Sequence, residues 1–374
     1  MYHEHNGWYN VSLEALNLLS MQTQTLGQYV LPNLHSVDWG TQPWELMPFL
    51  RLFMNPGLAS VHIEFPDETP HLYHPAAVSL IPTSNLTCLK LEGVESGEGF
   101  LDTLYNLLDR TSETLRSVYS DGEVSVAVAE KLFQLPYLRC LNVRLPRARI
   151  SPLAVAFPSL EKLTVFCQEV GSWIHVLQNI PNPALRKLRV TAMGETPLTE
   201  AGIRPLLPLG RLTILELPSC TAERCSNQLN DSIISELAMA LPQLKSLSLG
   251  RASESCGAAT SNVTVASLVA LSTNCVDLGF LQLHLNANDI TTRRRTHELD
   301  HQAYNFTCKL REFSVSSQPL PSDHNDILLI TFTILHIFPH LEFISSREGS
   351  WEAVGWVVQL FREAPRILPL PTAS

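Results

Sequence analysis

The sequence predicts an α/β solenoid in which parallel strands line a concave face and helices cover the convex face. Three observations predict this fold class. The first is a motif, Leu-x-x-(Leu/Val/Phe)-x-apolar, which recurs along the chain after a short turn that often contains proline. The second is the spacing of the motif, which ranges from 22 to 34 residues. The third is a set of segments between the motifs whose apolar residues recur at helical spacing.

The motif occurs twelve times in the chain. The alternation of apolar residues within it predicts a short strand with one buried face. Its spacing is typical of leucine-rich repeats, which run at about 20–29 residues, although the units lengthen toward the C-terminus. One unit cannot bury its apolar face alone, so neighbouring units must stack, and we expect a leucine-rich-repeat horseshoe of about twelve repeats over residues 31–350. The leading leucines are Leu34, Leu58, Leu86, Leu115, Leu138, Leu160, Leu185, Leu212, Leu244, Leu278, Leu310 and Leu341.

Three segments between motifs carry an apolar stripe and are predicted to form helices. The third segment follows Asn230, Asp231 and Ser232, which are residue types that cap helix N-termini. The stripes are Phe100, Leu101, Leu104, Leu107 and Leu108; then Trp173, Ile174, Leu177 and Ile180; then Ile233, Ile234, Leu237 and Leu241.

The two ends of the chain are predicted to cap the stack. Residues 1–30 contain one amphipathic helix, Val11–Gln22, which suits an N-terminal cap. Residues 351–374 contain a second, Trp351–Phe361, with Trp351, Val354, Val358 and Phe361 at helical spacing, and then a proline-rich tail that we expect to be loose.

Composition narrows the class of protein. The 45% hydrophobic and 17% charged content is typical of a folded chain. The net charge of −10 disfavours nonspecific binding to nucleic acid or an anionic membrane. No secretory signal opens the sequence, and the longest apolar run, Ile327–Phe338, is shorter than the about 20 residues of a membrane span. We therefore expect a cytoplasmic or nuclear protein with no cofactor.

The eight cysteines contain no CxxC pair, which disfavours zinc fingers and a disulfide scaffold. Reduced thiols that act as small core residues are the simpler expectation. They are Cys88, Cys140, Cys167, Cys220, Cys225, Cys256, Cys275 and Cys308.

The stretch LNDSIISELAMALPQLKSLSLG (229–250) resembles the leucine-rich repeat of F-box proteins. Two other stretches are weaker copies of this repeat: LTEAGIRPLLPLGRLTILELPSC (198–220) and VTVASLVALSTNCVDLGFLQLHL (263–285). In these copies, Cys220 and Cys275 lie where that repeat type often carries cysteine. The overall sequence pattern, which ends in FPHLEFISSREGSWEAVGWVVQLF (338–361), is similar to that of fungal F-box-type proteins.

This resemblance implies repeats that select a substrate for a ubiquitin ligase. In such proteins a separate F-box binds the Skp-family adaptor of a cullin. This chain departs from the family because residues 1–30 are too short for an F-box and hold a predicted cap instead. The adaptor and the cullin are therefore expected partners only if an F-box lies outside this chain.

The sequence offers one motif typical of catalysis. His297, Glu298 and His301 satisfy H-E-x-x-H, in which two histidines on one helix face bind zinc and the glutamate acts as general base. Here a polar stretch, TTRRRT (291–296), precedes the motif, and no third ligand segment stands out. A zinc hydrolase is therefore the remote alternative. The main prediction is a protein that is not an enzyme and has no metal site.

We expect a protein partner on the concave face, where the polar residues of each strand point. Repeats five to seven bring Arg144, Lys162, Lys187 and Arg189 together in a basic strip bounded by Phe166 and Glu216. Arginine and aromatic residues are enriched at the energetic centres of interfaces, whereas an ordinary mixed surface is the alternative. The middle positions of the twelve strands are Asp38, His62, Lys90, Tyr119, Asn142, Thr164, Arg189, Glu216, Ser248, Gln282, Ser314 and Ser345.

Two functions are open on these grounds. The first is substrate recognition of the F-box-like type, and the second is a leucine-rich-repeat scaffold unrelated to ubiquitin.

Overall fold

The computed structural model divides the chain into two compact units, Met1–Pro146 and Arg147–Ser374. Each has its own strands, helices and core. The residues described are 13–26, 29–40, 42–94, 97–148, 150, 157–168, 177, 184–192, 198–217, 229–250, 261–287, 289, 307–317, 323–346 and 349–367.

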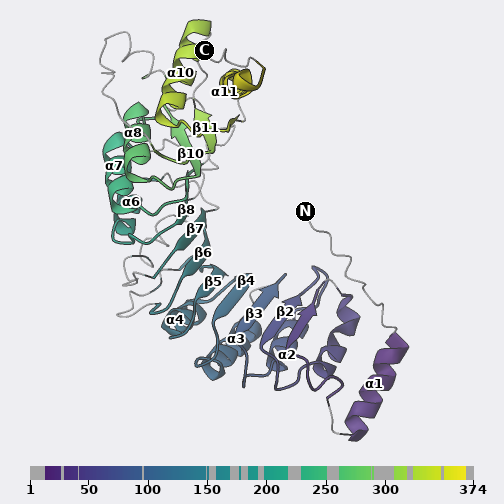
Figure 1. The fold of residues 1–374 in the computed structure, drawn as a ribbon. Helices are drawn as coiled ribbons and strands as arrows, with labels where there is room; N and C mark the ends of the chain where they lie inside the picture. Colours follow the sequence, from purple (N-terminus) through teal and green to yellow (C-terminus); the bar gives the residue numbers. More distant parts are fainter. Residues whose placement is uncertain are drawn as a thin grey trace. The chain divides into compact units, whose positions relative to one another are not determined.

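The first unit alternates strands with helices (Figure 1). Its strands follow one another in chain order, and every neighbouring pair is parallel. The described elements are α1 (Leu13–Leu26), β1 (Ser36–Trp39), the 3-10 helix η1 (Trp44–Leu52), β2 (Ser60–Glu64), α2 (Tyr73–Ser79), β3 (Cys88–Glu92), α3 (Glu98–Arg110), β4 (Ser117–Glu123), α4 (Val126–Gln134) and β5 (Cys140–Arg144).

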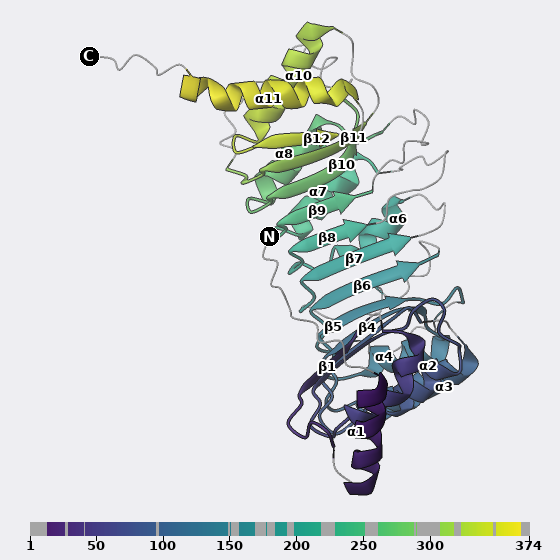
Figure 2. The same ribbon diagram turned by 90° about the vertical axis from the view of Figure 1, so that its right-hand side faces the viewer.

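The second unit repeats this plan, and its strands are again parallel and in chain order. Helices α7 and α8 lie along one face of the strands and leave the other face open (Figure 2). The described elements are β6 (Lys162–Cys167), β7 (Lys187–Ala192), α6 (Glu200–Ile203), η2 (Arg204–Leu206), β8 (Ile214–Leu217), α7 (Asp231–Ala240), β9 (Ser246–Leu249), α8 (Val265–Asn274), β10 (Phe280–Leu285), β11 (Glu312–Ser317), α10 (His324–Ile337), β12 (Phe343–Ser346) and α11 (Gly349–Ile367).

The leading leucines account for the repeating strands. All twelve predicted strands are present, and eleven of the twelve leucines that precede them are no more than 1% exposed. The exception is Leu34, which precedes the first strand and is half-buried. Removing one such side chain to alanine typically costs about 2–5 kcal/mol, so the row of leucines contributes strongly to both cores. The predicted α/β leucine-rich-repeat solenoid fold is confirmed.

The helices follow their apolar stripes. Helix α3 buries Phe100, Leu104, Leu107 and Leu108. Helix α7 buries the predicted stripe on its inner side, and the side chain of Asn230 accepts a hydrogen bond from the Ile233 amide, which is the expected N-cap. Of the helix predicted around residues 173–180, only Leu177 lies within the described residues, where it is buried.

The terminal helices lie where the sequence predicts them. Helix α11 buries Trp351, Val354 and Val358. Phe361, which was predicted to join them, is 43% exposed and instead contacts Phe332 of α10, with ring centroids 5.0 Å apart. The predicted division at residues 30 and 350 stays a prediction. Within the described chain, every helix is too short or too polar to cross a bilayer.

Candidate functional site

The open face, meaning the face of each strand row opposite its helices, carries the middle strand positions side by side. In the first unit the register aligns Asp38, His62, Lys90, Tyr119 and Asn142. Parallel neighbours lie about 4.8 Å apart, so consecutive side chains of this row are within contact distance. In the second unit the register aligns Thr164, Arg189, Glu216, Ser248, Gln282, Ser314 and Ser345.

On the first unit, the imidazole of His62 lies between two carboxylates from the neighbouring strands. Its Nδ1 is 2.8 Å from Oδ1 of Asp38 on β1, and its Nε2 is 2.7 Å from Oε2 of Glu92 on β3. The histidine side chain is 20% exposed, so these contacts are only partly screened by water. His62 is thereby held in one orientation on the open face.

Glu92 contacts Lys90 as well as His62. Lys90 Nζ lies 2.7 Å from the same Oε2 and 5.3 Å from the ring centroid of Tyr119. Burial favours protonation of Glu92, but the hydrogen bonds from Lys90 and His62 outweigh it and lower the pKa of the carboxyl below 4.5. The same hydrogen bond raises the pKa of Lys90 above 10.5. Burial, followed by the Glu92 charge, raises the pKa of Tyr119.

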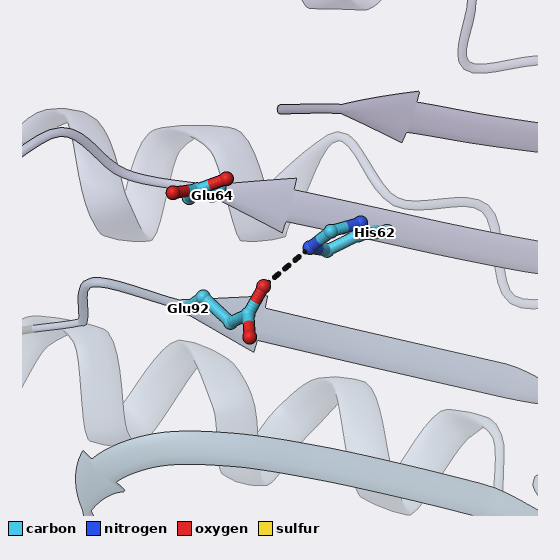
Figure 3. A group of neighbouring side chains, drawn as sticks. All are labelled: His62, Glu64 and Glu92. Atoms are coloured by element: carbon cyan, nitrogen blue, oxygen red, sulfur yellow. Dashed lines mark hydrogen bonds and ion pairs between the residues drawn. The ribbon is translucent and has the colours of Figure 1, made fainter. Parts of the chain in front are cut away.

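Glu64 completes a three-residue cluster with His62 and Glu92. Their ligand atoms all lie within 4.8 Å of one another. Figure 3 shows the three side chains on the neighbouring strands. Glu64 follows His62 by two residues and so points to the same face, and it lies opposite Glu92 in the β2–β3 register. This spacing of one imidazole and two carboxylates is compatible with a divalent cation.

A small cavity of about 220 Å³ lies at the end of β3 and β4 in the first unit. Within it, the hydroxyl of Thr69 and Nε of Arg144 are buried without a hydrogen-bond partner in the described residues. The cavity is lined by Pro66, Asp67, Thr69, His74, Gly93, Val94, Asp121 and Arg144.

Arg144 therefore belongs to the first unit, and the rest of the predicted basic strip belongs to the second. There, Lys162 lies directly opposite Lys187 in the β6–β7 register. Arg189 lies opposite Glu216 and forms a bidentate ion pair with it, with N–O distances of 2.5 and 2.8 Å. Glu216 thus balances much of the Arg189 charge, and the positive charge that has no ion-pair partner among the described residues of this strip rests on the two lysines.

The structure describes one of the two remaining predicted features, Phe166, but not the other, the H-E-x-x-H motif. Phe166 is half-buried on β6, opposite Thr191 of β7. The motif of His297, Glu298 and His301 lies outside the described residues. The assignment of the basic strip to a partner stays a prediction.

Sequence reasoning missed Glu64 and Glu92. The signal was nevertheless present, because each lies six residues after its leading leucine, Leu58 or Leu86, and two residues after a middle position. Aligning the repeats on these leucines would have placed both carboxylates side by side.

Similar chains are found among solved structures. A chain of the yeast Rad7–Elc1 complex is similar over 82% of this chain and 83% of that chain, with a TM-score of 0.41 and 16% identity. The leucine-rich repeat-containing protein LegL7 from Legionella pneumophila is similar over 84% of each chain, with a TM-score of 0.35 and 13% identity. No protein-family model matches the sequence. A search of curated proteins also found no match.

Proposed function

We propose that this chain is a non-catalytic protein-binding module whose open face selects its partner, in the manner of a substrate receptor. The observation that carries the proposal is the alignment of strand side chains in rows on the face opposite the helices. Repeat proteins commonly use such extended rows to bind other proteins. The ionisable groups of these rows are largely engaged with one another, as in the Arg189–Glu216 pair, which suits recognition better than proton transfer.

The second unit suggests the charge of the partner. Lys162 and Lys187 are neighbours on the open face and have no ion-pair partner among the described residues. Two adjacent ammonium groups repel each other, and an acidic surface would relieve that repulsion. We therefore expect the partner to place aspartate or glutamate side chains on this pair.

The finer role is that of a ubiquitin-ligase substrate receptor, and its alternative is a scaffold unrelated to ubiquitin. Both would use the same open face. They differ in whether a Skp-family adaptor and a cullin accompany the bound partner, which would require an F-box outside this chain. The zinc hydrolase remains the remote alternative.

The test is capture of partners from extracts of the source cells with the purified chain as bait. The variant Lys162→Glu/Lys187→Glu should lose the partner by about tenfold or more, because it reverses the charge at the proposed contact. Arg211→Glu/Lys245→Glu is the matched control, since it makes the same charge change at exposed residues outside the strands.

A partner retained by the control but lost by the strand variant supports the proposal. Equal retention by both variants would remove the lysine pair from the interface. The capture is then repeated with the full-length gene product as bait. Recovery of the adaptor and the cullin together with that partner favours the ligase role, and recovery of the partner without them favours the scaffold.

A further inference from the structure

We propose that the open face of the first unit binds a divalent metal ion of the Zn²⁺ class through His62 Nε2 and the carboxylates of Glu64 and Glu92. The site is independent of the lysine pair on the second unit and of the partner proposed above. The sequence had predicted no metal site, because its ligands come from two separate repeats.

The strand geometry brings the three ligands together. His62 and Glu64 are two residues apart on β2 and so lie on the same face of the strand. Glu92 occupies the position opposite Glu64 on β3 (Figure 3). All three ligand atoms lie within 4.8 Å of one another. An ion can therefore bind all three with side-chain adjustments and without a change of strand register.

Asp38 is not one of the three proposed ligands, but its contact with His62 supports the metal site. Its carboxylate is 2.8 Å from Nδ1 of His62. Histidines that bind metal ions commonly donate their other ring N–H to a carboxylate, which sets the tautomer and leaves Nε2 free for the metal. Asp38 is placed to do this for His62 from a third strand, β1.

Glu64 supplies a further observation. Glu64 is half-buried and forms no hydrogen bond or ion pair with any described residue, although His62 and Glu92 lie beside it. Its carboxylate is therefore available to a cation held between Glu64 and Glu92.

In the absence of a metal ion, the Lys90 ammonium lies beside Glu92 and offsets part of the negative charge of these carboxylates. When the ion binds, the Nε2 lone pair of His62 forms the bond to the metal, and any proton on Nε2 passes to the solvent. Lys90 either moves from Glu92 or keeps one of its two oxygens. In both cases its positive charge opposes the ion.

The mixed ligand set indicates the class of ion. Zn²⁺ accepts imidazole nitrogen and carboxylate oxygen together, whereas Mg²⁺ and Ca²⁺ prefer oxygen ligands throughout. We therefore expect Zn²⁺ to bind and Mg²⁺ at the same concentration not to compete.

The experiment is a calorimetric titration of the purified full chain with Zn²⁺. The wild type should bind one equivalent at this site, and His62→Gln should lose that equivalent. Asp38→Asn should weaken binding by about 10–100-fold, which is typical when the carboxylate behind a histidine ligand is lost. Lys90→Met should strengthen binding, because it removes the opposing charge.

Two controls separate this site from others. His35→Gln removes an exposed histidine near β1 and should leave binding unchanged. His297→Gln/His301→Gln tests the other candidate motif and should also leave this equivalent unchanged. Circular dichroism checks that each variant is folded.

The proposal is overturned if the wild type shows no saturable binding at millimolar Zn²⁺, or if His62→Gln retains every equivalent. It is equally overturned if Lys90→Met weakens binding. None of these results depends on partner capture, so this inference and the proposed function fail separately.

Discussion

Cys275 and Cys308 lie three and two residues before the leading leucines of successive repeats in the second unit, Leu278 and Leu310, and both thiols are buried. The Cys275 thiol donates to the carbonyls of Ala238 and Leu241, at 3.6 and 3.5 Å, near the end of α7. Cys308 repeats this pattern with the carbonyls of Cys275 and Leu278. The carbonyls of Leu241 and Cys275 also accept hydrogen bonds from the amides of Leu244 and Leu278, so there each thiol adds a second, weak hydrogen bond to the turn. The expectation of reduced core cysteines holds at these positions.

Alkylation should distinguish these thiols from an accessible one. Burial raises the pKa of Cys275 to about 12 and that of Cys308 to about 11. The thiolate is the reactive form, so at pH 8 in native buffer both should react with iodoacetamide more than about tenfold slower than the half-exposed Cys88. Mass spectrometry of timed samples measures the three rates. Equal alkylation rates for the three cysteines in the folded protein would contradict the burial of Cys275 and Cys308. As a control, the three rates should become equal when the protein is unfolded in urea.

At the scale of elements, one aspartate joins two successive helices of the second unit. Asp231, in the first turn of α7, accepts hydrogen bonds from the amide and the hydroxyl of Thr264, at 2.8 and 2.6 Å. It also accepts a hydrogen bond from the hydroxyl of the fully buried Ser267. Thr264 is the N-cap of α8, so Asp231 connects the starts of both helices. Repeats stack only through neighbours, which makes such links important for the register of the helices.

Replacing Asp231 by alanine should therefore destabilise the second unit more than loss of a single cap. We expect Asp231→Ala to cost about 3 kcal/mol, because it leaves the buried Ser267 hydroxyl and the two partly buried donors of Thr264 without their acceptor. Asn230→Ala removes only the α7 cap bond and should cost about 1 kcal/mol. Urea unfolding followed by circular dichroism compares the two variants. A smaller loss for Asp231→Ala than for Asn230→Ala would refute the linking role.

At the scale of the whole molecule, a parallel stack needs protected ends. A terminal strand presents unpaired backbone groups and one apolar flank, which invite pairing with another chain. In the second unit, α11 packs against β12 and buries Trp351, Val354 and Val358 completely. Exposed apolar side chains remain on the opposite side of α11, including Trp356 and Leu360. The buried side identifies α11 as the cap of this unit.

Truncation before residue 349 should consequently uncover the last repeat. We expect the shortened chain to form oligomers or aggregates at concentrations where the full chain is monodisperse, as measured by size-exclusion chromatography with light scattering. Removal of the residues after Ile367 is the control and should leave the elution unchanged. A monodisperse, folded product of the longer truncation would show that β12 needs no cap.

The sequence by itself determined the number of described strands, their places and the residues that share the open face. It could do so because side chains alternate strictly between the two faces of a strand and each leading leucine must be buried. Together these two constraints set the register of neighbouring strands. The N-cap at Asn230 was likewise readable, since capping involves residues close in sequence.

Only the tertiary structure decided which open-face side chains meet. Arg189 could have extended a basic strip, but its neighbour across the strands is Glu216, and the two form an ion pair. His62, Glu64 and Glu92 are unremarkable when read along the chain and form a cluster only when β2 lies beside β3. Partners about thirty residues apart depend on strand pairing and side-chain orientation, which local patterns do not specify.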